Sequence, residues 1–301
     1  MVLTAAAIMG TISSGGIGSI LRNMAEQDPT TIYLETFLTF TNIAGSGLIA
    51  SKFFTEPNHI PLRGHLLPVV VFCLVNVVNH QAISYQAPIH IILRNCTLLT
   101  IILLSTILLG KNYLLRKYLS VITITIGMIM CALATSSVEE SHGWDMGILL
   151  LIISLFGTAY LGIIQQQMYE EYGPHAEETA FISHLAYLPF FIFISDDLSF
   201  AMHKFYVSQP KASQRQFEWT GFGTASVFNG CCIKFEYLLA GHTDGLTVAF
   251  VVTLRKFISM LVTSIFLGNS FSALHWFGAN IVIAGALAYR NNWPLTLRRR
   301  R

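Results

Sequence analysis

Four basic residues interrupt long apolar stretches of the sequence: Arg94, Lys234, Arg255 and Lys256. A cation at the centre of a lipid bilayer costs about 2.5–3.5 kcal/mol on insertion scales, so a membrane segment that keeps one usually holds an anion with it. The acidic residues within the same apolar stretches are mainly Glu35 and Glu236. The excess of cations over acids predicts that this protein binds a polyanion.

Two of these cations belong to polar stripes on otherwise apolar segments. The stripes have helical spacing, and they are His90, Arg94 and Thr97 in one segment and Lys256, Ser259 and Thr263 in another. A guanidinium offers a planar fork to phosphate oxygens, whereas an ammonium is a compact charge. We predict that Arg94 and Lys256 hold the phosphates of a ligand such as a diphosphate, and that His90 belongs to the same site.

The other two cations leave alternatives open. Arg255 is rotated by about 100° from Lys256 on a helix, so it either binds ligand from another face or pairs with Glu35 or backbone carbonyls. Lys234 lies nearer a segment end, where it either supports the ligand or extends its amine to the membrane interface. Glu236 follows Lys234 by two residues and cannot face it on a helix. We therefore expect Glu236 to pair with a cation on another helix.

A third polar group is formed by Asn76, Asn79 and His80, spaced i, i+3 and i+4. Amides at this depth can contact a nucleobase or a sugar hydroxyl, or they can form hydrogen bonds between helices. We include all three residues in the predicted substrate site, with the interhelical alternative open.

The composition indicates an integral membrane protein. Of the 301 residues, 53% are hydrophobic and 11% are charged, and the mean hydropathy is +0.58. A soluble domain carries about 25% charged residues, so this chain has too few charges to cover the surface of a soluble protein. The net charge of +2 is too small to indicate a nucleic-acid partner.

The sequence predicts no metal and no cofactor. The five cysteines form no CxxC pair, and an odd number argues against a disulfide framework. Most of the ten histidines lie outside the apolar cores, without an HExxH pattern, and no Walker or GxGxxG loop is present.

About ten segments are apolar and long enough to cross a bilayer core about 30 Å thick. They are residues 2–20, 31–54, 65–87, 88–109, 114–135, 144–169, 177–196, 217–240, 244–268 and 271–290. The polar stretch 197–216 is expected to be the longest connection. The predicted fold class is all-α integral membrane.

Residues 108–130 align without gaps to residues 266–288, and the alignment matches Gly127 with Gly285. It divides the chain into halves at 1–135 and 144–290, each with five segments. An odd number of spans gives the halves inverted topology, a design in which secondary transporters place the site at the interface of the repeats. A chance similarity between two apolar helices is the alternative.

Lysine and arginine in short loops predict the orientation. With a cytosolic N-terminus, the cytosolic side receives ten of these residues and the opposite side four. Both termini, including the basic tail at 291–301 with Arg298–Arg301, are therefore expected in the cytosol.

The stretches VNVVNHQAISYQAPIHIILRNCTL and LTVAFVVTLRKFISMLVTSIFLGNSFSALHWFGANIVIAGALAY resemble the nucleotide-sugar transporter family of the drug/metabolite transporter superfamily. Within it, the resemblance is to the branch that carries UDP-xylose and UDP-N-acetylglucosamine. The more specific element covers residues 243–290, with TLRKF followed by HW and spaced glycines.

The resemblance implies ten helices in a Golgi or endoplasmic reticulum membrane, and exchange of a cytosolic nucleotide sugar for luminal nucleoside monophosphate. We predict that the cargo is a UDP-sugar, UDP-N-acetylglucosamine and/or UDP-xylose, exchanged for UMP. It carries the family's basic residues onto Arg94, Arg255 and Lys256, and more loosely onto Lys234. Lys234 stands where an arginine is expected, and His80 where the family more often has asparagine. The sugar and the base therefore stay open.

Other functions remain as alternatives. Another nucleotide anion, such as ATP/ADP or the sulfate donor PAPS, would also use basic helices. A membrane-bound transferase would need a catalytic histidine and acid near the membrane surface, and no such group is evident. A non-transporting partner of glycosyltransferases is a further alternative, and a homodimer or an association with glycosyltransferases is compatible with the transporter.

Overall fold

The computed structural model describes residues 2–25, 31–52, 57–83, 93, 95–135, 144–207, 212–266 and 272–291. In these ranges the chain forms eleven α-helices and one 3-10 helix. The elements are α1 Val2–Ala25, α2 Thr31–Ala50, α3 Leu62–Ile83, α5 Thr97–Leu109, α6 Leu115–Thr135, α7 Trp144–Tyr172, α8 Ala176–Tyr187, η1 Leu188–Ile194, α9 Ser195–Val207, α10 Ala212–His242, α11 Gly245–Phe266 and α12 Ala273–Asn291. The all-α prediction is confirmed for this part of the chain.

Four described helices are long and apolar enough to cross a membrane, within α3, α6, α7 and α11. Three further apolar helices, within α1, α5 and α12, are shorter. Large apolar side chains lie exposed on the outside of the bundle, among them Leu66, Ile107 and Phe193. Outward-facing apolar side chains are what a lipid environment requires, since lipid replaces water around a membrane helix.

The predicted boundaries are wrong in two places. The predicted span 177–196 is interrupted, because α8 ends at Tyr187 and a 3-10 helix follows with Pro189 near its start; proline lacks the N–H needed for an α-helical hydrogen bond. The predicted connection 197–216 is helical at 197–207 and 212–216. Hydropathy windows detect apolar composition, so they miss helices that carry polar residues.

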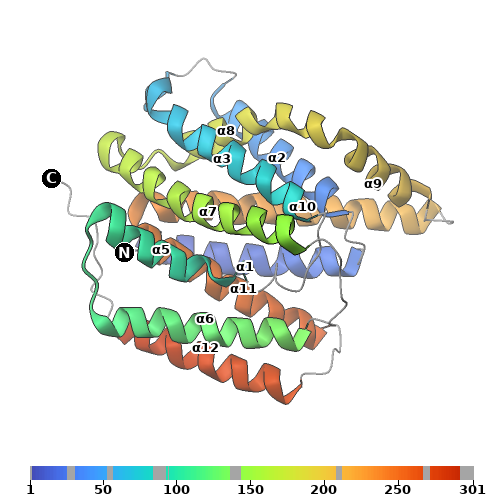
Figure 1. Cartoon of the computed structure of the whole chain (residues 1–301). Coiled ribbons are helices and arrows are strands. Elements are labelled where there is room, and N and C mark those ends of the chain that lie inside the picture. The colour runs from blue at the N-terminus through green and yellow to red at the C-terminus, as the bar shows by residue number, and fades with distance from the viewer. Residues whose placement is uncertain are drawn as a thin grey trace.

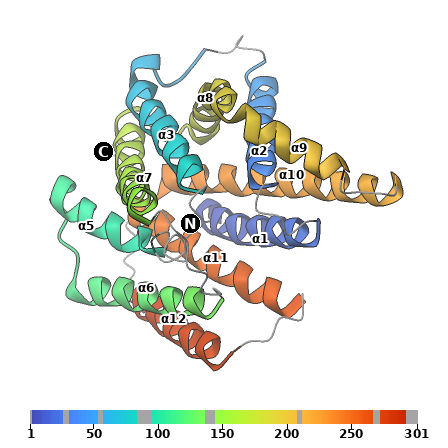
Figure 2. The same ribbon diagram turned by 45° about the vertical axis from the view of Figure 1, so that its right-hand side comes forward.

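Helices α6 and α12 lie side by side in both views (Figures 1 and 2), and glycines allow their close approach. A Cβ atom added to Gly127 would lie 2.8 Å from the carbonyl oxygen of Gly278, and one added to Gly285 would lie 2.8 Å from Ile124 Cγ1. Each glycine faces two residues of the opposite helix: Gly278 and Val282 for Gly127, and Ser120 and Ile124 for Gly285. The sequence alignment of 108–130 with 266–288 exchanges these two sets of partners.

Other helix contacts show the same exchange when the segments of the two halves are matched in order, α1 with α7, α2 with α8, α3 with α10 and α5 with α11. Helix α1 packs against α10 and α11, and α7 packs against α3 and α5; α2 packs against α8, and α5 against α11. Figures 1 and 2 show α1 running beside α10 and α11 in the middle of the bundle. The packing therefore brings α3 and α5 together with α7 and α11. Of these four helices, α3 and α11 carry predicted site residues, namely Asn76, Asn79, His80, Arg255 and Lys256.

Candidate functional site

A small cavity of about 170 Å³ lies where α3, α5, α7 and α11 meet. Its polar lining is Asn79, Thr97, Ser154, Thr158 and Lys256, and its apolar lining is Leu93, Leu151, Leu155 and Val252. None of the described residues that line this central pocket is acidic. The central pocket therefore combines one cation with an amide and three hydroxyl groups.

Helical spacing positions these side chains. Leu93 and Thr97 reach the central pocket from one side, and Val252 and Lys256 reach it from α11. Val252 and Lys256 are spaced i, i+4, so they present one face of α11 to the cavity. Lys256 is partly buried, which lowers the effective dielectric around its ammonium group and strengthens its attraction for an anion.

Asn79 is oriented by a neighbouring helix. Ser154 Oγ donates a hydrogen bond of 2.5 Å to Asn79 Oδ1, and Thr158 Oγ1 donates to the Ser154 carbonyl oxygen at 2.8 Å. The amide oxygen of Asn79 is thereby held toward α7, because a hydrogen bond limits rotation of the amide. This contact links α3 in the first half of the chain to α7 in the second.

The structure brings together two of the predicted site residues, Lys256 and Asn79, with Thr97 from the first polar stripe. His90 and Arg94 lie outside the described residues, so their predicted role is untested. The sequence analysis missed Ser154 and Thr158. Their i, i+4 hydroxyl spacing within the apolar run LLLIISLFGTAY is the signal that could have found them.

Arg255 lies in a separate cluster at the contact of α1, α10 and α11. Its Nη1 atom is 3.4 Å from Glu236 Oε1 and 2.9 Å from Cys232 Sγ. The side chains of Arg255 and Glu236 are only 20% and 22% exposed. A Cβ atom at Gly15 would come within 2.4 Å of Arg255 Cδ, so α1 leaves room for the arginine. The expected pairing of Glu236 with a cation on another helix is confirmed.

Asn76 and His80 also lie apart from the central pocket's lining. Asn76 Nδ2 donates to the Phe72 carbonyl oxygen on its own helix at 2.8 Å. His80 is 5% exposed, and its Nδ1 is 2.8 Å from the Tyr187 hydroxyl within a group of aromatic rings. The predicted polar face is thus divided among three environments, since Asn79 lines the central pocket, Asn76 bonds its own backbone and His80 lies among aromatic rings.

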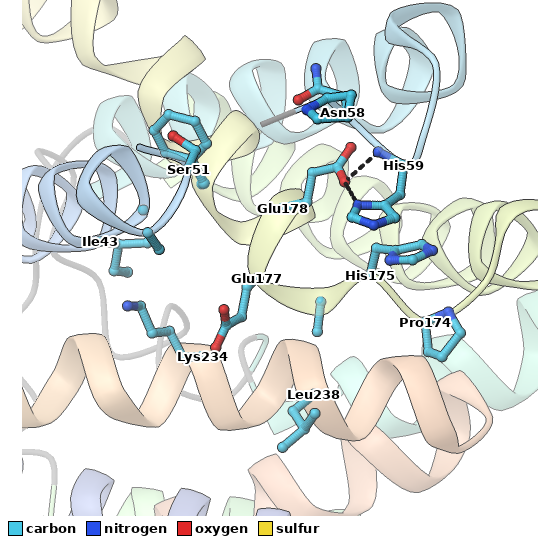
Figure 3. Close-up of a pocket in the computed structure, with 15 residues that line it drawn as sticks. Ile43, Ser51, Asn58, His59, Pro174, His175, Glu177, Glu178, Lys234 and Leu238 are labelled. Atoms are coloured by element: carbon cyan, nitrogen blue, oxygen red, sulfur yellow. Dashed lines mark hydrogen bonds and ion pairs between the residues drawn. The ribbon is translucent and has the colours of Figure 1, made fainter. Parts of the chain in front are cut away.

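Lys234 lines a second, larger pocket of about 390 Å³ between α2, α8 and α10. Its Nζ donates to Ser46 Oγ at 2.7 Å. Glu177 and Glu178 line the same pocket, and Figure 3 shows Glu177 and Lys234 on facing helices. This outer pocket carries two carboxylates beside its lysine, so it is a poor place for a polyanion.

Comparison with known proteins identifies the family. The model of the UAA transporter family matches residues 1–293. This chain belongs to that family. It is 34% identical over 293 residues to the endoplasmic reticulum GDP-fucose transporter of Drosophila melanogaster, with 88% of this chain and 83% of that protein covered. It is 30% identical over 275 residues to the UDP-xylose and UDP-N-acetylglucosamine transporter of Danio rerio, with 84% and 83% covered.

A solved crystal structure shares the fold. The TM-score is 0.69 at 13% sequence identity, and the match covers 98% of both chains. As a member of the UAA family, the chain is a nucleotide-sugar transporter homologue and not an enzyme, so the transferase alternative is set aside. The resemblance seen in the sequence is confirmed at the level of the family.

Proposed function

We infer that this protein exchanges a cytosolic UDP-sugar, UDP-N-acetylglucosamine or UDP-xylose, for UMP from the lumen of the endoplasmic reticulum or Golgi. The observation that supports this function best is the charge of the central pocket. Lys256 lies there with Asn79 and Thr97, and none of the described lining residues is acidic. A diphosphate needs such a cation and hydrogen-bond donors without competing carboxylates.

Each polar group of the central pocket has a distinct role in this proposal. Lys256 binds phosphate oxygens, and Arg94, three residues before Thr97, supplies the second cation from the other half of the chain. Asn79 contacts the base or sugar, while the Ser154 hydroxyl holds its orientation. Arg255 compensates the charge of Glu236 and acts on the ligand only through the helix it shares with Lys256.

Transport is proposed to proceed by alternating access between two inverted five-helix halves with both termini in the cytosol. The reciprocal contacts of Gly127 and Gly285 and the exchanged helix pairs support such a two-fold relation. The central cavity of about 170 Å³ is smaller than the roughly 300–1,000 Å³ of typical ligand pockets. Separation of the halves is therefore needed to admit a whole nucleotide sugar.

An exchange assay with purified protein in proteoliposomes tests this function. Vesicles are preloaded with UMP, GMP or no nucleotide, and uptake of labelled UDP-N-acetylglucosamine, UDP-xylose, GDP-fucose, ATP and PAPS is followed. We expect UDP-sugar uptake that depends on internal UMP. Uptake that is independent of internal nucleotide would contradict exchange, and uptake of ATP or PAPS alone would contradict the cargo class.

GDP-fucose with GMP as the returning nucleotide is a second candidate. It rests on the 34% identity to a relative named for GDP-fucose transport. Both nucleotides present a diphosphate to Lys256, so the phosphate contacts do not distinguish them. The GMP-loaded vesicles decide between the two candidates, since a GDP-sugar carrier would show uptake only there.

A further inference from the structure

Three potential metal ligands lie together at the outer pocket: His59, His175 and Glu178. One nitrogen or oxygen atom from each lies within 4.8 Å of those of the other two. Figure 3 shows the two imidazole rings next to each other and the Glu178 carboxylate reaching them from α8. His59 belongs to the connection between α2 and α3, whereas His175 and Glu178 belong to the turn between α7 and α8 and the first turn of α8.

One pair of these atoms already has the spacing of two ligands on one ion. His59 Nδ1 is 3.3 Å from Glu178 Oε2. Two ligand atoms that are each about 2.0–2.1 Å from a tetrahedral Zn²⁺ lie about 3.3–3.4 Å apart. No two of the three donor atoms are more than 4.8 Å apart, so a donor has to move by at most about 1.5 Å to reach the same spacing, which side-chain rotation in a partly exposed site allows.

The surroundings hold the carboxylate in place. Glu178 Oε1 accepts the Ile60 N–H at 3.1 Å and lies 3.2 Å from His65 Nε2. The side chain of His65 is 2% exposed, and its Nδ1 is buried without a hydrogen-bond partner among the described residues. Partners of this kind orient the ligands of protein metal sites. The His59 side chain is 65% exposed and leaves a path for an ion from solvent.

The donor set selects the class of metal. Two imidazoles and one carboxylate suit Zn²⁺, which also accepts a water molecule as its fourth ligand. Magnesium and calcium prefer all-oxygen sites. We propose that His59, His175 and Glu178 form a Zn²⁺ site that ties the α2–α3 connection to the α7–α8 turn.

Zinc at this position joins the two halves of the chain at one end of the bundle. An ion held by both halves opposes their relative movement, so Zn²⁺ slows exchange. This second step rests on the proposed transport function, whereas zinc binding itself does not. The site also explains why the outer pocket gathers carboxylate and imidazole groups that a nucleotide sugar would not use.

Zinc binding is tested with full-length protein purified without a polyhistidine tag and treated with EDTA. Calorimetry and thermal unfolding with ZnCl₂ are expected to show one Zn²⁺ per chain and a raised unfolding temperature, with no response to MgCl₂. His59→Gln and His175→Gln are expected to weaken binding at least tenfold. His203→Gln, at an exposed histidine of α9, is the matched control and should bind as the wild type does.

Absence of zinc binding by the wild type, or wild-type affinity in His59→Gln, would overturn the proposal. Because the His59 side chain is largely exposed, that variant should unfold at the wild-type temperature without metal, which separates loss of the site from loss of the fold. His65→Gln provides a second check, since loss of an outer partner weakens metal affinity by about 10–100-fold.

The effect on transport is measured in the UMP exchange assay. Zinc is expected to slow the wild type several-fold, EDTA to restore the rate, and His59→Gln to be insensitive. Equal slowing of both proteins would overturn the inhibitory role of this site. If no cargo is exchanged under any condition, the proposed function fails, and the calorimetric result still decides whether zinc binds.

Discussion

The central and outer pockets differ in charge more than in size. The outer pocket is the larger, at about 390 Å³ against about 170 Å³, yet its Lys234 shares the lining with Glu177 and Glu178. The central pocket has Lys256 and no acidic residue in its described lining. Like charges repel strongly where the dielectric is low. The difference in charge therefore supports our two proposals, a polyanion in the smaller pocket and a cation at the larger one.

The largest expected effect comes from the central cations. Lys256→Ala and Arg94→Ala are each expected to reduce exchange by about 10- to 150-fold, because one charge-assisted hydrogen bond contributes about 1.5–3 kcal/mol. Lys256→Arg should retain part of the rate. The measurement is nucleotide exchange at equal amounts of folded, inserted protein, and Arg116→Ala at the exposed start of α6 is the control. Wild-type rates in either alanine variant would remove that residue from the site.

Arg255, the neighbour of Lys256 in the sequence, is expected to stabilise the fold and not to bind the cargo. Glu236→Ala leaves the buried guanidinium without its carboxylate and is expected to lower the free energy of unfolding by about 3–5 kcal/mol. Replacing both Arg255 and Glu236 by methionine should recover most of that loss. Thermal unfolding in detergent measures the change in stability. A Glu236→Ala variant as stable as the wild type would contradict the ion pair.

The two asparagines of α3 offer a matched pair. Asn79→Ala is expected to lower exchange about tenfold, since a hydrogen bond to a bound ligand contributes about 0.5–1.5 kcal/mol and Asn79 also positions α7 through Ser154. Asn76→Ala should change the rate by less than about threefold, because Asn76 bonds the backbone of its own helix. Equal losses in both variants would contradict a ligand contact made by Asn79 in the central pocket.

The two-fold relation predicts equal effects at Gly127 and Gly285. Alanine at either position meets atoms of the opposite helix at 2.8 Å and is expected to cost about 1–3 kcal/mol of stability by overpacking. Gly45→Ala, with open space around its Cβ position, should be neutral or stabilising by up to about 1 kcal/mol. Destabilisation by only one of the two interface variants would argue against the exchange of partners.

The smallest effect is expected at Lys234. Lys234→Met should reduce exchange by no more than about threefold, because Glu177 and Glu178 outnumber this lysine in the outer pocket and the pocket offers a ligand no net positive charge. A loss as large as that of Lys256→Ala would instead extend the cargo path through the outer pocket. The exchange rates of Lys234→Met and Lys256→Ala are measured in the same assay, so they can be compared directly.

The sequence alone predicted the membrane class and the main helices, because burial in lipid imposes a requirement on local composition, and the resemblance carried by residues 243–290 predicted the family. The same principle identified the buried cations and the need of Glu236 for a partner on another helix. It missed the interruption at Pro189 and the helical nature of 197–207. Composition does not report where a helix bends or where a polar segment stays helical.

Only the tertiary structure decided which residues meet. Helical spacing indicates the face on which a side chain lies, but the neighbour of that face depends on how distant helices pack. Asn79 and Lys256 share a pocket through the meeting of α3 and α11 with α7, and His59 meets Glu178 across 119 positions of the chain. The sequence therefore determined which groups were costly to bury. Packing determined which side chains lie beside Lys256 and which lie beside Lys234.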